Sequence, residues 1–246
     1  MLFRSDAVIS SVEQALRAAW GNSTILGRTV LSNLFAQNDT LEPFFDLSLG
    51  RSDDIEDANY TSTWFIGSHS PEFAAIEDAP RIPQVSEHLW AGLVDGFMVN
   101  GRNISLGQSV VAGTAPGKLV AVLDSGTSNA MVPVDLADAI YGGIPGNLKV
   151  NGTWYVPCYI GVNVTIVIGY VEPLYVETTI YLHTYSGQQF PIHPLDTKLI
   201  TPQVLFANGT RVGLVLCTGS FQGQDPEGEQ SDMLLGDVFL HNVYTS

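Results

Sequence analysis

A carboxylate stands at an unusual place in this sequence. The apolar run Leu119–Leu123 leads directly into "DSGTS", Asp124–Ser128, in which an ionisable group is followed by small and hydroxyl residues. An ionisable group at a strand end raises the question of proton-transfer chemistry. The simpler interpretation is a turn, because Asp, Ser and Gly form turns and because Ser128 and Asn129 could cap a helix that follows. The run alone leaves both interpretations open.

The other residue types that carry chemistry form no such pattern. No two histidines have the spacing of metal ligands, which favours solvated or core histidines over a zinc site. No G-x-S-x-G surrounds a serine, which disfavours Ser128 as a nucleophile, and no glycine motif for phosphate occurs. The sequence therefore predicts neither a metal nor a cofactor. The five histidines are His69, His88, His183, His193 and His241.

The composition is that of a folded and strongly acidic protein. The chain has 246 residues, of which 45% are hydrophobic, and this is enough for a sizeable core in one large or two small domains. Its formal net charge of -15 has the wrong sign for phosphate groups, so nucleic acid and anionic membranes are excluded as expected partners. Acidity also suits work at low pH, although many secreted proteins are acidic for solubility alone.

The start of the chain does not resemble a signal peptide. Polar residues interrupt its apolar stretch, and the spacing of Val8, Val12 and Leu16 predicts an amphipathic helix over Ala7–Trp20. The most apolar internal stretch, Tyr159–Val171, is too short to cross a bilayer. We therefore expect no transmembrane segment, and an export signal would lie outside these residues.

Two features nevertheless indicate an extracytoplasmic protein, either secreted or vacuolar. Cys158 and Cys217 could close one bridge in an oxidising compartment or remain as two buried thiols. Seven N-x-S/T sequons, more than expected by chance, lie mostly beside turn residues, as glycosylation sites in surface loops do. The candidate acceptors are Asn22, Asn38, Asn59, Asn103, Asn151, Asn163 and Asn208.

Short strands must position the carboxylate. From about Thr61 the chain consists of short apolar or alternating runs broken by Gly, Pro, Asn and Asp, which predicts a mostly β fold with short helices. Asn100-Gly101 is the strongest hairpin signal. Helices are expected at 30–37 and at 134–141, the second with Leu136, Ala139 and Ile140 on one face, and the acidic stretch 50–63 reads as a linker or exposed loop.

The order of the motifs resembles the pepsin-like aspartic proteases, and most closely their fungal secreted members. The matching pieces are the strand into "DSGTS", then "AIYGGIPG", "NGTWYVPC", "FPIHPLD" and "MLLGDVFLHNVYTS". Upstream, "TVLSNLFAQN", "PFFDLSLGR", "TSTWFIG" and "RIPQVSEHLWAGLVDGFMVNG" follow in the order of that family. The resemblance implies the C-terminal lobe of the bilobal acid protease fold, at 92–246, preceded by interlobe strands at 61–91 and a remnant of the N-terminal lobe at 1–60.

The resemblance also implies roles for the residues of the run. Two such loops, one from each lobe, place two carboxylates together in this family, and Asp124 would be one of them. Ser125 would brace one loop against the other, Gly126 would let backbone approach, and Thr127 would hydrogen-bond the carboxylate. The segment Leu234, Leu235 and Gly236 would pass behind the loop, with Asp237 serving structure rather than catalysis. The family pattern further implies a Cys158–Cys217 disulfide.

The sequence departs from the family at its N-terminal side. No second Asp-Ser-Gly or Asp-Thr-Gly occurs, and no tyrosine matches the residue of the substrate-covering flap. The chain is therefore expected to be N-terminally truncated, with the missing N-terminal lobe as its natural partner and proteins or peptides as substrates.

Three functions remain open on these grounds. The first is an aspartic endopeptidase of which this chain holds only one of the two catalytic Asp residues. The second is a non-catalytic lobe that binds peptides or a partner. The third, which the pseudo-symmetric lobe disfavours, is a homodimer in which two copies of Asp124 form the pair.

Overall fold

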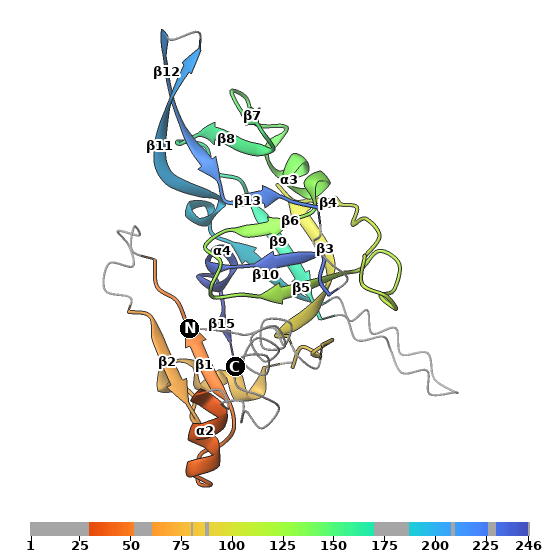
Figure 1. The fold of residues 1–246 in the computed structure, drawn as a ribbon, viewed down its shortest axis with the longest axis vertical. Coiled ribbons are helices and arrows are strands. Elements are labelled where there is room, and N and C mark those ends of the chain that lie inside the picture. The colour runs from red at the N-terminus through yellow and green to blue at the C-terminus, as the bar shows by residue number, and fades with distance from the viewer. Residues whose placement is uncertain are drawn as a thin grey trace, which may run out of the picture. The chain divides into compact units, whose positions relative to one another are not determined.

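The computed structural model describes residues 30–51, 61–79, 81–86, 89–169, 187–207, 210–225 and 230–245 (Figure 1). The chain divides into two compact units. Unit 1 comprises Met1–Pro80, Glu87–Leu89 and Val243–Ser246, and unit 2 comprises Arg81–Ser86 and Trp90–Asn242. The predicted mostly β fold with short helices is confirmed. The assignment of residues 1–60, 61–91 and 92–246 to parts of two lobes stays a prediction.

Unit 1 contains a small antiparallel sheet with the strand order β15-β1-β2. Its strands are β1 (Phe45–Ser48), β2 (Thr63–Ile66) and β15 (Tyr244–Thr245), so the last described residues of the chain pair with an early strand. The unit also holds the helix α2 (Val30–Gln37), at the predicted position, and the 3-10 helix η1 (Pro71–Asp78).

A buried carboxylate holds the strands of unit 1 together. Asp46 on β1 is fully buried, and its Oδ2 lies 2.9 Å from Nδ1 of His69 and accepts a hydrogen bond from the hydroxyl of Tyr244. The same hydroxyl accepts a hydrogen bond of 2.9 Å from the backbone N–H of Ser70, and the ring of Tyr244 stacks on Phe73. Because a buried carboxylate is costly without partners, these contacts fix β15 on β1.

Unit 2 is built on an eight-stranded sheet. Seven of its strands follow the order β10-β9-β3-β5-β14-β6-β13, and β4 pairs with β3 beside this path. The apolar run of β5 is buried at four of its five residues, as a central strand covered on both faces must be. The strands are β3 (Ala91–Val99), β4 (Arg102–Ile104), β5 (Leu119–Leu123), β6 (Ala130–Val132), β9 (Val164–Ile168), β10 (Gln188–Ile192), β13 (Phe221–Gly223) and β14 (Met233–Leu235).

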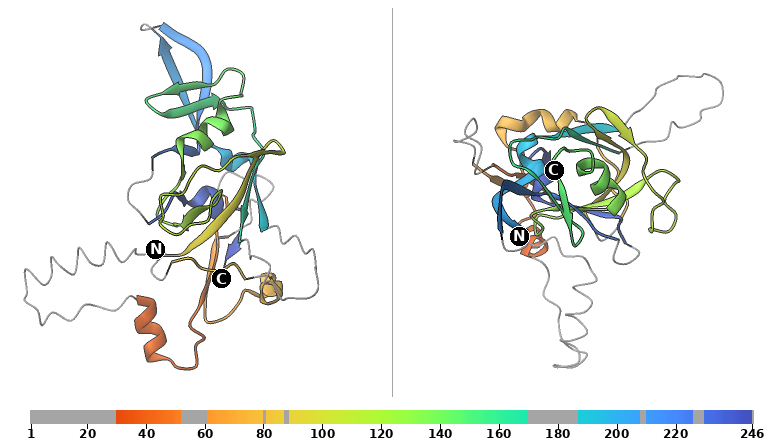
Figure 2. Two further views of the ribbon diagram at one scale, coloured as in Figure 1. Left: turned by 90° about the vertical axis from the view of Figure 1, so that its right-hand side faces the viewer. Right: turned by 90° about the horizontal axis from the view of Figure 1, so that it is seen from above.

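A second sheet of unit 2 has the order β11-β12-β8-β7. Its strands are β7 (Leu148–Val150), β8 (Thr153–Pro157), β11 (Lys198–Ala207) and β12 (Thr210–Gly219). The long pair β11 and β12 runs out beyond the other strands of the unit (Figures 1 and 2).

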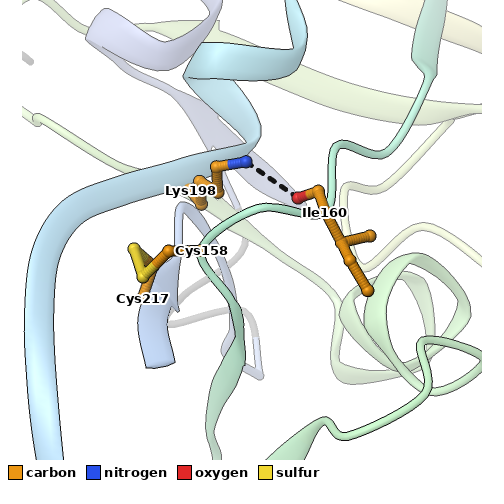
Figure 3. The surroundings of a disulfide bond; sticks show 4 residues. All are labelled: Cys158, Ile160, Lys198 and Cys217. Carbon is orange, nitrogen blue, oxygen red and sulfur yellow. Dashed lines mark hydrogen bonds between the residues drawn. A yellow bond between two sulfur atoms is a disulfide. The ribbon is translucent and has the colours of Figure 1, made fainter. Parts of the chain in front are cut away.

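The predicted disulfide between Cys158 and Cys217 is present and ties the end of β8 to β12 (Figure 3). Lys198, at the start of β11, lies near it and is buried, with its Nζ donating to the carbonyl of Ile160 at 2.8 Å. Burial lowers the pKa of this ammonium group.

The predicted hairpin at Asn100-Gly101 is confirmed. These two residues have φ values of 50° and 75° and connect Val99 to its partner Arg102, as in a two-residue turn with positive φ at both positions. Asn151-Gly152 forms the same kind of turn between β7 and β8, with φ values of 51° and 84°.

The helix expected at 134–141 is α3 (Val134–Tyr141). Its buried residues are Leu136, Ala137, Ile140 and Tyr141, so the apolar face includes Ala137 and Tyr141 rather than Ala139. The N-cap is Pro133, and β6 lies between Asn129 and the helix, so the interpretation of Ser128 and Asn129 as helix caps is wrong. The Tyr141 hydroxyl donates to the carbonyl of Thr197, and burial raises its pKa.

Several sequence predictions lie outside the described residues. They are the helix at 7–20, most of the acidic stretch 50–63, His88, His183, and the sequons at Asn22, Asn59 and Asn208. In the described ranges, no helix combines the length and the apolar character that crossing a membrane requires.

A single buried carboxylate joins three parts of unit 2. Asp232, just before β14, has 4% of its surface exposed. Its Oδ2 accepts from the Ser109 hydroxyl and from the Val120 N–H, both at 2.6 Å, and its Oδ1 accepts from the Val110 N–H at 2.7 Å. The carboxylate thus accepts hydrogen bonds from two backbone N–H groups, those of Val110 and Val120, which would otherwise lose this acceptor.

We predict that Asp232→Ala lowers the free energy of unfolding by about 3 kcal/mol, because three donors lose their acceptor at a buried site. Urea denaturation of the wild type and variant measures the change. Asp225→Ala, at an exposed aspartate, is the matched control and should stay within about 0.5 kcal/mol of the wild type. Equal midpoints for the two variants would contradict the role of Asp232.

Candidate functional site

The candidate site begins where the buried strand β5 ends. The N–H of Leu123 donates to the carbonyl of Trp90 at 2.8 Å, and the N–H of the next residue, Asp124, donates to the carbonyl of Leu235 on β14 at 3.0 Å. The backbone of Asp124 is therefore held by a neighbouring strand, while its side chain is partly exposed. A rigid backbone beneath a reachable carboxylate is what an acid or base requires.

The loop that follows supplies one donor to each carboxylate oxygen of Asp124. The N–H of Gly126 donates to Oδ1 at 2.9 Å, and the hydroxyl of Thr127 donates to Oδ2 at 2.7 Å. The Thr127 N–H also donates to the Asp124 carbonyl at 3.2 Å, which closes the turn. Each oxygen keeps a lone pair for a further partner.

Backbone from the far end of the chain passes directly against this loop. β14 pairs in parallel with β5, with Leu234 opposite Val122 and Leu235 opposite Leu123. After Gly236, the N–H of Asp237 donates to the carbonyl of Thr127 at 2.8 Å. A Cβ on Gly236 would lie 1.9 Å from the carbonyl oxygen of Thr127 and 2.3 Å from that of Asn129, so only glycine allows this approach.

Asp237 shares the electrostatic environment of Asp124. It begins the short helix α4 (Asp237–Leu240) and is half-buried. Burial raises the pKa of its carboxyl group, the negative charge of Asp124 raises it further, and His241 opposes both. The assignment of Asp237 to structure rather than catalysis stays a prediction.

The structure brings the predicted loop and its supporting segment together: Asp124, Gly126 and Thr127 with Leu234, Leu235 and Gly236. Ser125 lies in the same loop and is partly exposed.

The histidines that the structure describes make their hydrogen bonds outside the loop of Asp124. His69 contacts Asp46 in unit 1, and His241 lies 3.3 Å from Asp196 in unit 2. His193 is exposed, and its ring nitrogen accepts from the Leu195 N–H. Across the described ranges, no group of three or more His, Cys, Asp or Glu is arranged to hold a metal ion.

Sequence reasoning missed two residues that support the loop. Asp232, the residue before β14, accepts a hydrogen bond from the Val120 N–H on β5, and Trp90 supplies the carbonyl that holds Leu123. An aspartate immediately before an apolar strand was a visible signal for Asp232, whereas a backbone carbonyl leaves no mark in the sequence.

Comparison with known proteins identifies the family. The sequence model of the family described as "Eukaryotic aspartyl protease" matches residues 18–246, which is nearly the whole chain. The chain belongs to this family. The resemblance found in the order of its motifs is thereby confirmed.

Two curated relatives within this family have similar sequences. Pepsin A from Rhinolophus ferrumequinum is 27% identical over 165 residues, which cover 67% of this chain and 34% of that protein. The probable aspartic-type endopeptidase CTSD from Arthroderma otae is 28% identical over 157 residues, which cover 63% and 32%. The chain therefore matches about a third of the length of each relative.

We predict that Gly236→Ala lowers the free energy of unfolding by about 3 kcal/mol or more, because the new methyl group overlaps two backbone oxygens that have nowhere to move. Urea denaturation with comparison of midpoints measures the loss. Gly107→Ala is the matched control, since a Cβ there would meet nothing within 4 Å. A Gly236→Ala protein as stable as the Gly107→Ala protein would rule out the close approach.

A second prediction concerns pH. Because the pKa of Asp237 is raised on folding, the folded protein holds this proton more tightly than the unfolded chain does. Its contribution to stability is present at low pH and is lost as the pH rises through the folded pKa. Asp237→Asn should therefore match the wild type in acid and exceed it in stability at neutral pH.

Thermal unfolding between about pH 3 and about pH 8 tests this expectation. Asp225→Asn, at an exposed carboxylate, serves as the control and should give a difference from the wild type that changes little with pH. A pH-independent difference for Asp237→Asn as well would show that the folded environment does not perturb this group.

Proposed function

We propose that the protein is an aspartic-type endopeptidase in which Asp124 supplies one of two catalytic carboxylates. The observation that carries the proposal is the position of Asp124 at the end of a buried strand, with one oxygen held by Gly126 and the other by Thr127. Family membership over residues 18–246 supports the same reaction class.

The second carboxylate in this proposal comes from an N-terminal lobe outside these 246 residues. Two carboxylates at hydrogen-bonding distance share a proton, because both cannot ionise cheaply. One then takes a proton from water, and the other protonates the carbonyl oxygen of the scissile peptide. The water oxygen attacks the carbonyl carbon directly, without an acyl-enzyme intermediate.

The other residues of the site would hold this pair in place. The Ser125 hydroxyl would brace the loop against its counterpart, and Gly126 would let backbone approach the carboxylates. The segment Leu234, Leu235 and Gly236 would keep the loop from moving during the reaction, as the hydrogen bond of Leu235 to Asp124 and that of the next residue, Asp237, to Thr127 favour. The substrates in this proposal are proteins or peptides, and the missing lobe is the partner.

A non-catalytic lobe is the alternative, and one observation favours it. The 246 residues contain one Asp-Ser-Gly and no Asp-Thr-Gly, so this chain offers a single carboxylate of the required kind. Asp124 alone cannot act as acid and base in one step. We therefore assign activity to the two-lobed protein and expect none from this chain alone.

We also propose that the protein works outside the cytoplasm, in a secreted or vacuolar form. The disulfide between Cys158 and Cys217 supports an oxidising compartment. The sequons at Asn38, Asn103, Asn151 and Asn163 support it further, because all four asparagines are exposed, as glycan acceptors must be.

The experiment compares this chain with a protein in which an N-terminal lobe of the family is restored. Cleavage of a quenched peptide at about pH 4, with and without a statine-type inhibitor, measures activity. We expect inhibitor-sensitive cleavage by the restored protein and no cleavage by this chain without the N-terminal lobe. In that protein Asp124→Asn should lower turnover at least about 10²–10⁴-fold, because acid–base catalysis is lost.

Asp225→Asn is the control for this substitution and should leave turnover unchanged. Binding of the inhibitor to the restored Asp124→Asn protein checks that the cleft is still formed. Full activity of the Asp124→Asn protein would contradict the proposal that Asp124 is a catalytic carboxylate. Inhibitor binding with no cleavage by the restored wild type would favour the non-catalytic alternative.

A further inference from the structure

The hairpin formed by β7 and β8 presents an unusual edge. Among the described strands, β7 is the last in the order β11-β12-β8-β7, so its outer side pairs with no other described strand. All three of its residues are exposed. Such an edge offers unpaired backbone groups to a strand of another molecule.

The side chains of β7 increase the tendency of this edge to associate with another molecule. Lys149 points to one face, where its Nζ bonds Asp138 Oδ1 at 2.5 Å and lies over the ring of Trp154. Leu148 and Val150 alternate with it onto the other face and are 39% and 42% exposed. An exposed edge strand with two apolar side chains on one face favours association between molecules.

A glycosylation sequon stands at the tip of the same hairpin. Asn151-Gly152-Thr153 contains the acceptor asparagine at the first central position of a two-residue turn, where it is exposed and has a φ of 51°. Thr153, the third sequon residue, is the strand partner of Val150. The acceptor is therefore one residue from the apolar edge.

The other described sequons lack this combination. The Asn38 side chain accepts hydrogen bonds from the N–H and the hydroxyl of Thr40. Asn103 lies within β4, and the backbone of Asn163 is paired with Asn100. The disulfide that joins β8 and β12, in the same sheet, indicates an oxidising compartment, which in eukaryotes is also where N-linked glycans are added.

We propose that Asn151 carries an N-linked glycan and that this glycan covers the apolar edge of β7, an inference that rests on the proposed extracytoplasmic location. The donor class is an oligosaccharide linked to a lipid pyrophosphate, which a separate transferase brings to the chain. The Asn151 Nδ2 forms a bond to the anomeric carbon of the sugar as the bond from that carbon to the pyrophosphate oxygen breaks. The lipid pyrophosphate leaves, and one amide proton passes to solvent.

The modification is tested on protein secreted from a eukaryotic host. Peptide mapping with mass spectrometry should find the Asn151 peptide glycosylated, with release by an amidase leaving Asp at position 151. Asp tolerates positive φ, so Asn151→Asp removes the acceptor without straining the turn. Thr153→Ala removes the sequon by a second route, and Thr153→Ser is the matched control that keeps it.

We expect the glycan in the wild type and in Thr153→Ser, and its absence from Asn151→Asp and Thr153→Ala. An unmodified Asn151 peptide in the secreted wild type would overturn the proposal.

The covering role needs a separate measurement. Light scattering should give a higher weight-average mass for Asn151→Asp and Thr153→Ala than for the wild type under the same conditions. Adding Val150→Lys to Asn151→Asp should restore the wild-type value, because it replaces one of the two exposed apolar side chains on that face of β7 with a charged one. Equal masses for the glycosylated and unglycosylated proteins would overturn the claim that the glycan covers β7.

Discussion

Two backbone hydrogen bonds on either side of Gly236 control the geometry of the candidate site. The carbonyl of Leu235 accepts from Asp124, and the N–H of Asp237 donates to Thr127, so residues 235–237 and the loop that follows β5 fix each other. This double contact requires the two backbones to approach more closely than any side chain permits. The position of the Asp124 carboxylate is therefore set by main-chain geometry, with the Gly126 and Thr127 donors adjusting only its orientation.

Carboxylates support this arrangement in two different ways. Asp232 is buried and fully supplied with donors, so its charge joins β5, β14 and the residues around Ser109 into one body. Asp237 is half-buried beside Asp124, and its pKa is raised by burial and by that neighbouring charge. Asp232 thus supports the fold through its hydrogen bonds, whereas Asp237 shares the electrostatic environment of the candidate site.

Local patterns in the sequence predicted local structure well. The apolar run 119–123, the pair Asn100-Gly101 and the helical spacing at 134–141 gave the correct elements, because turn chemistry and side-chain periodicity act within a few residues. The contacts of Asp46, Tyr141 and Asp232 could not be predicted in the same way. Asp46 bonds Tyr244, 198 residues away, Tyr141 bonds Thr197, 56 residues away, and Asp232 bonds Val120, 112 residues away. The groups of Thr197 and Val120 are backbone atoms that any residue type could supply.

The pairing of β15 with β1 has a consequence for the order in which the protein forms. Residues 45–48 leave the ribosome before residues 90–242, whereas their strand partner and the Tyr244 hydroxyl that bonds Asp46 are synthesised after them. Residues 90–242 contain all the strands of unit 2 and can pair as they emerge. Domains usually fold from the N-terminus during synthesis, whereas here the sheet of unit 1 must wait until β15 has emerged. During the synthesis of unit 2, β1 therefore carries a carboxylate that has not yet met the Tyr244 hydroxyl.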